Sequence, residues 1–304
     1  MKKKIFTGAA VAIVTPFKGK NNEEVDYDAL GALIEYQIEN GTDAIVICGT
    51  TGEASTMPDT EHLAVIEYAV QKTAGRIPVI AGTGSNDTKH AIALSQKAEQ
   101  LGADALLSVT PYYNKTTQDG LYEHFKVIAE SVSVPIILYN VPGRTNLNIE
   151  PATFERLCKI PNINAVKECN LLQIPETVKR CGDELNLYSG EDGYVHFLMS
   201  AGGLGVISVV SNIAPRYMSD MVKAYLNGDI EKSWKMQVAC QDLVKALFCE
   251  VNPIPIKEAV NRIGLRAGGC RLPLVDMKPE NKERLAAAIE HFRMILLVRN
   301  SSRF

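Results

Sequence analysis

Short apolar runs and longer amphipathic stretches alternate along the chain as far as Val210, and this alternation constrains the fold more than any other feature. The apolar runs predict eight strands: Ala9–Thr15, Ala44–Cys48, Pro78–Ala81, Ala105–Val109, Pro135–Tyr139, Ile163–Lys167, Leu185–Ser189 and Gly205–Val210. The stretches between them predict helices: Tyr27–Asn40, Thr60–Ala74, Thr88–Leu101, Gly120–Ser131, Ile149–Lys159 and Glu191–Ser200. Strands separated by single helices pair in parallel, and eight of them predict an α/β fold, a closed (β/α)8 TIM barrel.

Beyond Ala214-Pro215 the pattern becomes wholly helical. The expected helices are Tyr217–Leu226, Ile230–Cys249, Ile256–Ile263 and Lys282–Leu297. We therefore predict a barrel catalytic domain over residues 1–225 and a C-terminal helical extension over 226–304. The polar end, Arg299 to Phe304, is expected to fray.

The first residues allow two interpretations. Met1-Lys2-Lys3-Lys4 followed by the apolar run Ile5 to Val14 is similar to a short signal peptide. The competing interpretation is a first barrel strand within Gly8 to Phe17. No clean small-x-small cleavage site follows, and removing the segment would leave the barrel one strand short. We expect the segment to stay in the fold.

Composition excludes several classes of function. A net charge near −3 and a pI near 6.0 give no basic face for nucleic acid or for an anionic membrane. No apolar stretch approaches the ~20 residues of a membrane span. The seven cysteines form no C-x-x-C pair, which is typical of a reduced, cytoplasmic protein, and the five histidines show no metal-ligand spacing.

Lys167 is the unusual residue of its strand, because it lies in the apolar run Ile163 to Cys169. Burial disfavours the charged form of a lysine, so it lowers the pKa and leaves a neutral amine that can form a Schiff base. The alternative is a lysine that extends from a strand end into water.

Other unusual residues fall on the same side of the predicted barrel. They follow or end their strands: Thr50-Thr51-Gly52-Glu53, Tyr112-Tyr113, Tyr139, Arg144, Lys167 and Gly190-Glu191-Asp192. Barrels of this kind carry their active sites at the C-terminal ends of the strands. Agreement among six such features favours a site there.

The residue types indicate a reaction. Tyrosine hydroxyls bridged by a threonine can pass the protons that imine formation requires. The Gly49-Thr50-Thr51-Gly52 turn offers donors for one carboxylate, and Arg144 offers a planar fork for a second. A keto acid and a carboxylate-bearing acceptor are suggested. Taken singly, each residue has a simpler interpretation as a loop exit, a packing tyrosine or a solvated arginine.

Several motifs together resemble the dihydrodipicolinate synthase family of pyruvate-dependent class I aldolases. They are Gly49-Thr50-Thr51-Gly52-Glu53, Thr110-Pro111-Tyr112-Tyr113-Asn114, Leu138-Tyr139-Asn140-Val141-Pro142-Gly143-Arg144-Thr145, Val166-Lys167-Glu168, Gly202-Gly203-Leu204-Gly205-Val206-Ile207-Ser208 and Asn252-Pro253-Ile254-Pro255. The similarity extends from Phe6 to Leu297.

The resemblance implies a condensation of pyruvate with L-aspartate-4-semialdehyde to 4-hydroxy-tetrahydrodipicolinate, in lysine and diaminopimelate biosynthesis. Lys167 would form the imine with pyruvate, and Tyr139 would relay protons to and from it. Thr50 and Tyr113 would complete the relay, with Tyr113 supplied by a neighbouring subunit of a dimer or tetramer. No metal or organic cofactor is implied.

The remaining implied roles concern substrate binding. Thr51 would hold the pyruvate carboxylate, and Arg144 would hold the carboxylate of the aldehyde. Ile207, through its backbone, and Gly190 would line the pyruvate pocket.

Three alternatives remain open. A sister enzyme such as N-acetylneuraminate lyase or a keto-deoxy sugar acid aldolase shares the lysine and tyrosine, but generally lacks an arginine at Arg144. A non-catalytic barrel that binds keto acids would not need an imine lysine with a proton relay. A phosphate-binding barrel is disfavoured because the glycine-rich Ala201–Gly205 precedes a strand and has no P-loop lysine.

The resemblance also implies an effector site in relatives that lysine inhibits. The matching positions are Ala54, Ser55, Asp59, His62, Asn86, His90 and Tyr112. His90 stands where those relatives place a glutamate that pairs with the effector's ammonium group. Without that carboxylate, about 1.5–3 kcal/mol of charge-assisted hydrogen bonding is lost. We predict weak or absent inhibition by lysine.

Overall fold

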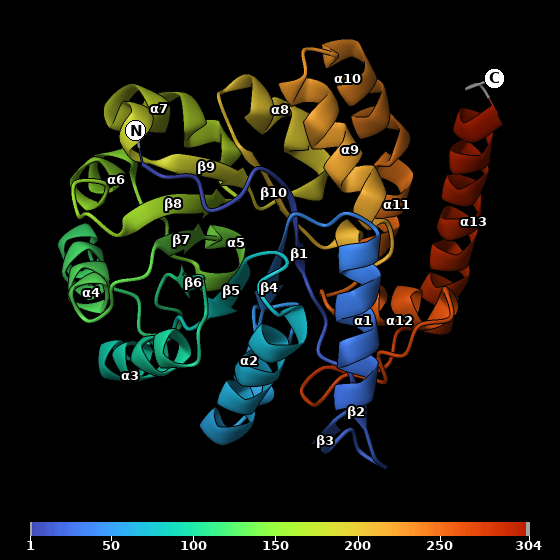
Figure 1. The fold of residues 1–304 in the computed structure, drawn as a ribbon, viewed down its shortest axis with the longest axis horizontal. Helices are drawn as coiled ribbons and strands as arrows, with labels where there is room; N and C mark the ends of the chain where they lie inside the picture. The colour runs from blue at the N-terminus through green and yellow to red at the C-terminus, as the bar shows by residue number, and fades with distance from the viewer. Residues whose placement is uncertain (1, 302–304) are drawn as a thin grey trace.

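A computed structural model describes residues 2–301 and shows a closed barrel of eight parallel strands (Figure 1). The strands are β1 (Gly8–Ala12), β4 (Ala44–Ile47), β5 (Val79–Gly82), β6 (Ala105–Val109), β7 (Ile136–Asn140), β8 (Ile163–Glu168), β9 (Asn186–Ser189) and β10 (Gly205–Ser208). They are hydrogen-bonded in the order β1-β10-β9-β8-β7-β6-β5-β4, and β1 closes the ring against β4. The predicted (β/α)8 barrel is confirmed.

The barrel strands bury both faces, so side-chain alternation sorts their residues between two cores. Ile137 and Ala165 belong to the core inside the barrel, whereas Leu138 and Val166 pack against the surrounding helices. Because side chains alternate, Tyr139 and Lys167 point to the inside, two residues after Ile137 and Ala165. The same register places Tyr139 directly beside Lys167 on the neighbouring strand.

Helices cover the outside of the barrel (Figure 1). They are α1 (Tyr27–Glu39), α2 (Asp59–Thr73), α3 (Thr88–Gln100), α4 (Gln118–Glu130), α6 (Pro151–Leu157), α7 (Ile174–Cys181), α8 (Val195–Ser200) and α9 (Pro215–Leu226). Side chains cap several of them, for example Asp26, which accepts from the Ala29 N–H at 3.0 Å.

The sequence missed or misplaced some elements. The helix α7 and the one-turn helix α5 (Pro142–Thr145) were not predicted, because each is short and starts with a proline or an X-Pro step. The helix expected over Glu191–Ser200 begins at Val195, after a 3₁₀ turn at Asp192–Tyr194. A small hairpin of β2 (Phe17–Lys18) and β3 (Glu24–Val25) was also missed.

The C-terminal extension comprises α10 (Ile230–Ala239), α11 (Gln241–Leu247), α12 (Ile254–Arg262) and α13 (Pro279–Ser301). The single helix expected over Ile230–Cys249 is divided at Cys240, a break that the continuous amphipathic pattern hides. The helix α13 runs through residues 299–301, which were expected to fray, while residues 302–304 lie outside the described part. The division at residue 225 stays a prediction.

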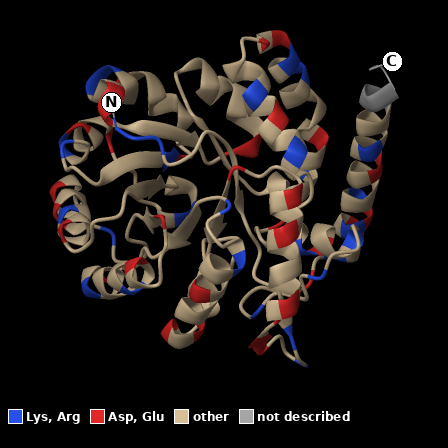
Figure 2. Ribbon diagram, in the orientation of Figure 1, with Lys and Arg blue, Asp and Glu red and all other residues tan. Residues whose placement is uncertain are grey.

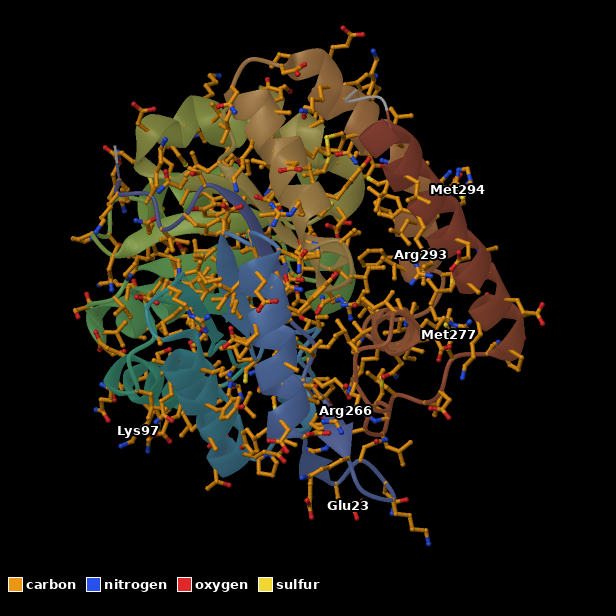
Figure 3. The ribbon with its side chains drawn as sticks, turned by 45° about the vertical axis from the view of Figure 1, so that its right-hand side comes forward. Glu23, Lys97, Arg266, Met277, Arg293 and Met294 are labelled. Atoms are coloured by element: carbon orange, nitrogen blue, oxygen red, sulfur yellow. The ribbon has the colours of Figure 1, made fainter. Side chains whose placement is uncertain are left out.

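The surface carries both signs of charge on most helices (Figure 2). No helix among residues 2–301 is long and apolar enough to cross a membrane. The helix α13 packs on α11 and α12, and its Met294 is 59% exposed (Figure 3).

A buried ion pair joins the extension to the barrel. Nζ of Lys257, in α12, lies 2.7 Å from Oε1 of Glu53, in the loop after β4, and both side chains are almost fully buried. Lys257 also donates to the Gly269 carbonyl at 2.7 Å, and the Arg271 N–H donates to Glu53 at 2.9 Å. Burial lowers the pKa of Lys257, and the nearby Glu53 carboxylate opposes that shift.

Removing one partner of this pair will destabilise the protein strongly, because it leaves the other charge buried and uncompensated. We expect Lys257→Met to lower the free energy of unfolding by about 3–5 kcal/mol, measured by denaturant unfolding at matched protein concentration. The control is Lys282→Met, which removes a partly exposed partner of Glu258 at 3.4 Å and should cost ~0–1 kcal/mol. Equal effects of the two variants would contradict the prediction.

Candidate active site

Lys167 is the penultimate residue of β8, lies inside the barrel and is only 6% exposed. Its Nζ lies 4.3 Å from the centroid of the Tyr139 ring. Burial lowers the pKa of Lys167, while the nearby Cys169, Asp192 and Glu191 act in the opposite direction. The arrangement favours a neutral amine, which is the nucleophile that attacks a carbonyl.

Tyr139 is the neighbour of Lys167 and links it to the first threonine of the loop after β4. Its hydroxyl is hydrogen-bonded to Thr50, and burial raises its pKa above the ordinary value. A buried, protonated phenol can donate and accept a proton in turn. Lys167, Tyr139 and Thr50 therefore lie close together in the barrel.

The second threonine, Thr51, is buried and contacts the C-terminal extension. Its Oγ1 accepts a hydrogen bond from the side-chain amide of Asn252 at 2.9 Å. Arg144, in α5, donates through Nη2 to the Asn252 carbonyl at 3.2 Å. The two predicted carboxylate-binding residues thus meet the same asparagine.

Gly190 directly follows β9, and Ile207 lies in β10, the two strands that come after β8 around the barrel. A side chain at Gly190 would clash with Sγ of Cys169, and its Cβ would lie 3.3 Å from Cε of Lys167. Ile207 is buried in β10, in the core inside the barrel. Both predicted pocket residues are therefore close to the barrel interior that holds Lys167.

Tyr113 is not brought to the other relay residues within one chain. Its side chain is 94% exposed, and its φ of 69° is in the left-handed region, which is uncommon for a bulky residue. The loop is held by Asn114, whose side-chain amide donates to the Asn86 carbonyl at 2.9 Å. Its preceding neighbour, Tyr112, is 39% exposed.

The predicted effector residues include two histidines that lie in different environments. His62 is buried and its Nε2 lies 2.8 Å from the Gly82 carbonyl, and desolvation lowers its pKa. His90 is more exposed, and its Nε2 lies 2.9 Å from Oδ1 of Asp59. Asp59 is therefore already engaged by His90.

A cavity of about 510 Å³ joins the two groups of residues. Its lining includes Thr50, Tyr139 and Arg144 from the catalytic group and Ser55, Asp59, His62, His90 and Tyr112 from the effector group. Thr50, Tyr139 and Arg144 thus share one cavity with these effector candidates, whereas Lys167 and Thr51 are not among the residues that line it.

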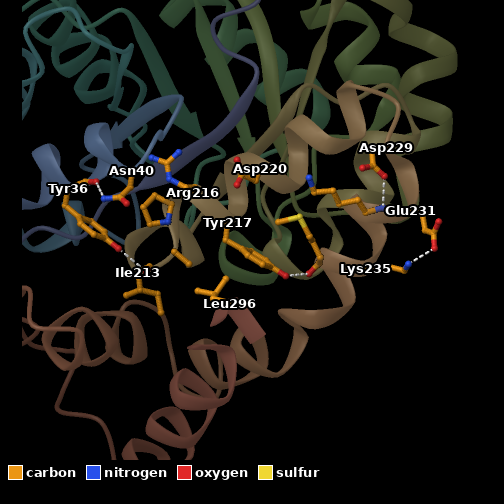
Figure 4. Close-up of a pocket in the computed structure, with 14 residues that line it drawn as sticks. Tyr36, Asn40, Ile213, Arg216, Tyr217, Asp220, Asp229, Glu231, Lys235 and Leu296 are labelled. Carbon is orange, nitrogen blue, oxygen red and sulfur yellow. Dashed lines mark hydrogen bonds and ion pairs between the residues drawn. The ribbon is translucent and has the colours of Figure 1, made fainter. Parts of the chain in front are cut away.

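A larger cavity, of about 640 Å³, lies elsewhere, between α1, α9, α10 and α13 (Figure 4). It contains none of the predicted site residues, and its polar groups bond to one another. Tyr36 donates to the Ile213 carbonyl at 3.2 Å, and Lys235 pairs with Glu231 at 2.6 Å.

The sequence analysis named two buried polar residues near Lys167, Asp192 and Glu168, but assigned no role to either. Oδ2 of Asp192 accepts from the N–H groups of Val209 and Val210 at 2.8 and 3.1 Å and so fixes the end of β10. Glu168 is buried among amide donors, and burial raises its pKa to about 7. Both follow recognised motif residues, and that adjacency was the available signal.

No cluster of potential metal ligands occurs among the described residues.

Comparison with known proteins agrees with this geometry. A model of the dihydrodipicolinate synthetase family matches residues 5–292. The 4-hydroxy-tetrahydrodipicolinate synthase of Acetivibrio thermocellus is 57% identical over 295 residues, which cover 97% of this chain and 100% of that protein.

Two solved structures are similar over nearly their whole length. Dihydrodipicolinate synthase from Aquifex aeolicus has a TM-score of 0.92 at 47% identity and covers 95% of this chain and 98% of its own. The chloride-inhibited dihydrodipicolinate synthase from Acinetobacter baumannii, complexed with pyruvate, has a TM-score of 0.91 at 43% identity, with 94% and 98% covered. With its barrel, its buried lysine and this extent of similarity, the chain belongs to the dihydrodipicolinate synthetase family.

Proposed function

We propose that this chain condenses pyruvate with L-aspartate-4-semialdehyde to give 4-hydroxy-tetrahydrodipicolinate, the first committed step of lysine and diaminopimelate biosynthesis. The observation that carries the proposal is the desolvated amine of Lys167 beside Tyr139 at the C-terminal end of the barrel. The relatives at 57% and 53% identity bear the name of this synthase.

The reaction starts with attack of the neutral Lys167 amine on the keto carbon of pyruvate. Tyr139 and Thr50 pass protons as the carbinolamine loses water and becomes an imine. Loss of a methyl proton gives an enamine, which attacks the aldehyde carbon of the second substrate. The amine of that substrate then displaces Lys167 as the ring closes, so the enzyme is regenerated.

Substrate carboxylates are held by two different parts of the site. Thr51 and the neighbouring backbone bind the carboxylate of pyruvate, while Gly190 and Ile207 shape the wall around it. Arg144 binds the carboxylate of the semialdehyde through its planar fork of donors. Arg144 disfavours the alternative of a sugar-acid aldolase, whose substrate has no carboxylate at that point.

A second copy of the chain completes the proton relay. Tyr113 is too exposed to serve its own site, and we propose that it enters the site of a partner within a dimer or a tetramer. Thr50 is exposed beside Tyr139 and is the residue that a partner's tyrosine would meet.

Reductive trapping tests the imine. Treatment with pyruvate and then borohydride should leave a reduced pyruvyl adduct on Lys167, as mapped by peptide mass spectrometry. Semialdehyde added before the borohydride should lower the yield of this adduct, because the condensation releases Lys167. Lys257 is an internal control, because it is equally buried but held by Glu53 at 2.7 Å and should carry no adduct. An adduct that the semialdehyde leaves untouched would favour a sugar-acid aldolase. No adduct would mean that Lys167 is structural.

Subunit complementation tests the shared tyrosine. Tyr113→Phe and Lys167→Ala should each lower kcat, the first by about 10²–10⁴-fold through loss of the proton relay. Co-expression of the two variants with different tags should yield hybrids in which one site holds both wild-type residues. Purified hybrids should be far more active than either parent. Hybrids that are as inactive as their parents would show that Tyr113 does not cross between subunits.

Lysine inhibition tests the effector pocket. We expect little inhibition of the wild-type chain, because His90 supplies no carboxylate and also engages Asp59. His90→Glu should strengthen inhibition by lysine at least ~tenfold, through one charge-assisted hydrogen bond. His90→Gln is the matched neutral control and should gain nothing. Inhibition of the wild type at low micromolar lysine would refute the prediction.

A further inference from the structure

Asn252 lies between the two residues that are proposed to bind the substrate carboxylates. It belongs to the C-terminal extension, two residues before α12, and it is 5% exposed. Its side-chain Nδ2 donates to Oγ1 of Thr51 at 2.9 Å, and its carbonyl accepts from Nη2 of Arg144 at 3.2 Å. One residue of the extension therefore contacts both residues at once.

The direction of the bond to Thr51 has a chemical consequence. An amide N–H can only donate, so the Thr51 hydroxyl accepts this bond and keeps its own hydrogen free for another acceptor. An ionised carboxylate is such an acceptor, and it cannot donate in return. Asn252 thus leaves Thr51 in the state that suits the carboxylate of a keto acid.

The contact to Arg144 acts in a similar way. A guanidinium has five N–H donors in a fixed plane. The bond to the Asn252 carbonyl uses one of them and limits rotation of the group, while the remaining donors are available to a carboxylate. The side chain of Arg144 is otherwise exposed and long, so a fixed point reduces the orientations that it samples.

The loop that carries Thr51 has other supports, which argues that the amide of Asn252 does more than hold the loop. Glu53, two residues later, is fixed by the buried Lys257 at 2.7 Å and by the Arg271 N–H at 2.9 Å. Backbone bonds from Gly52 and Glu53 close the turn itself. Moreover, Oδ1 of Asn252 is fully buried without a hydrogen-bond partner among the described residues. A buried amide with one unused oxygen is costly, so a purely structural role would be served better by an apolar residue.

We propose that Asn252 is a positioning residue that directs the Thr51 hydroxyl toward the pyruvate carboxylate and fixes the fork of Arg144. The inference rests on the proposed function, because it needs a pyruvate site at Lys167. It assigns part of keto-acid recognition to the C-terminal extension, outside the barrel.

Asn252→Asp is the sharpest test, since it preserves shape and reverses the bond. At neutral pH the introduced carboxylate can only accept, so it accepts a hydrogen bond from the Thr51 hydroxyl. It also adds a negative charge beside the bound anion. The half-saturating pyruvate concentration for adduct formation on Lys167 should rise at least ~tenfold relative to wild type, as one charge-assisted contact is lost. The ratio of this pyruvate concentration to that of the wild type should fall at lower pH, because the introduced carboxyl is then protonated and can donate to Thr51 again.

Two further variants separate positioning from folding. Asn252→Ala removes the donor, so it should raise the half-saturating pyruvate concentration, and that rise should persist at low pH. This variant replaces the aspartate variant if the latter does not fold. Asn164→Asp is the matched control. Asn164 is 7% exposed at the other end of β8 and donates to the Lys3 carbonyl at 2.9 Å, so its variant should leave pyruvate binding unchanged.

The outcomes distinguish the inference from the function. If wild-type protein forms the Lys167 adduct and both Asn252 variants saturate at the wild-type pyruvate concentration, the inference fails and the function stands. If the aspartate variant is weakened equally at every pH, the reversal of the bond is not the cause, and the inference also fails. If wild-type protein forms no adduct, both fail together.

Discussion

Desolvation of one amine is the constraint on which the rest of this site depends. Two lysines among the residues that the structure describes are deeply buried, and their surroundings differ. Lys257 has a carboxylate at 2.7 Å and a carbonyl at 2.7 Å, which keep a charged ammonium satisfied. Both ammonium groups lie over an aromatic ring, Lys257 over Phe17 at 4.2 Å and Lys167 over Tyr139 at 4.3 Å. Among the described residues Lys167 has no ion pair like the one with Glu53, so the effect of burial on its pKa is less fully opposed. The first arrangement suits a structural ion pair, and the second suits the nucleophile that we propose.

The strand pattern made both the barrel and the position of Lys167 predictable. Alternation of side chains along a strand is local, so Ala165 and Lys167 can be assigned to one face from sequence, and the register then places Tyr139 beside them. The contacts of Asn252 and Lys257 could not be derived in this way. They join residues about two hundred positions apart, and only the packing of the extension brings them to the loop after β4. The short helix that contains Arg144 could not be predicted for another reason, because its four residues are too few to show a helical periodicity.

The effector region shows how one substitution changes more than one contact. A glutamate at the position of His90 would leave Asp59 free and would add a second negative charge. The histidine removes the added charge and also forms a bond of 2.9 Å with Asp59, so the local field becomes less attractive to a cation. Because this region shares its cavity with Thr50 and Tyr139, a ligand bound there would lie next to the proton relay.

The extension is part of the site for a physical reason. A barrel presents loops at the C-terminal ends of its strands, and such loops carry few buried apolar side chains of their own. The loop after β4 is closed by its own backbone bonds and is also held from outside, through an ion pair to Lys257 and a hydrogen bond from the Asn252 amide. Both partners flank the start of α12, so any movement of that helix would shift Thr51 and Arg144 together. The proposed orientation of two substrate carboxylates relative to Lys167 would thereby depend on one element beyond the barrel.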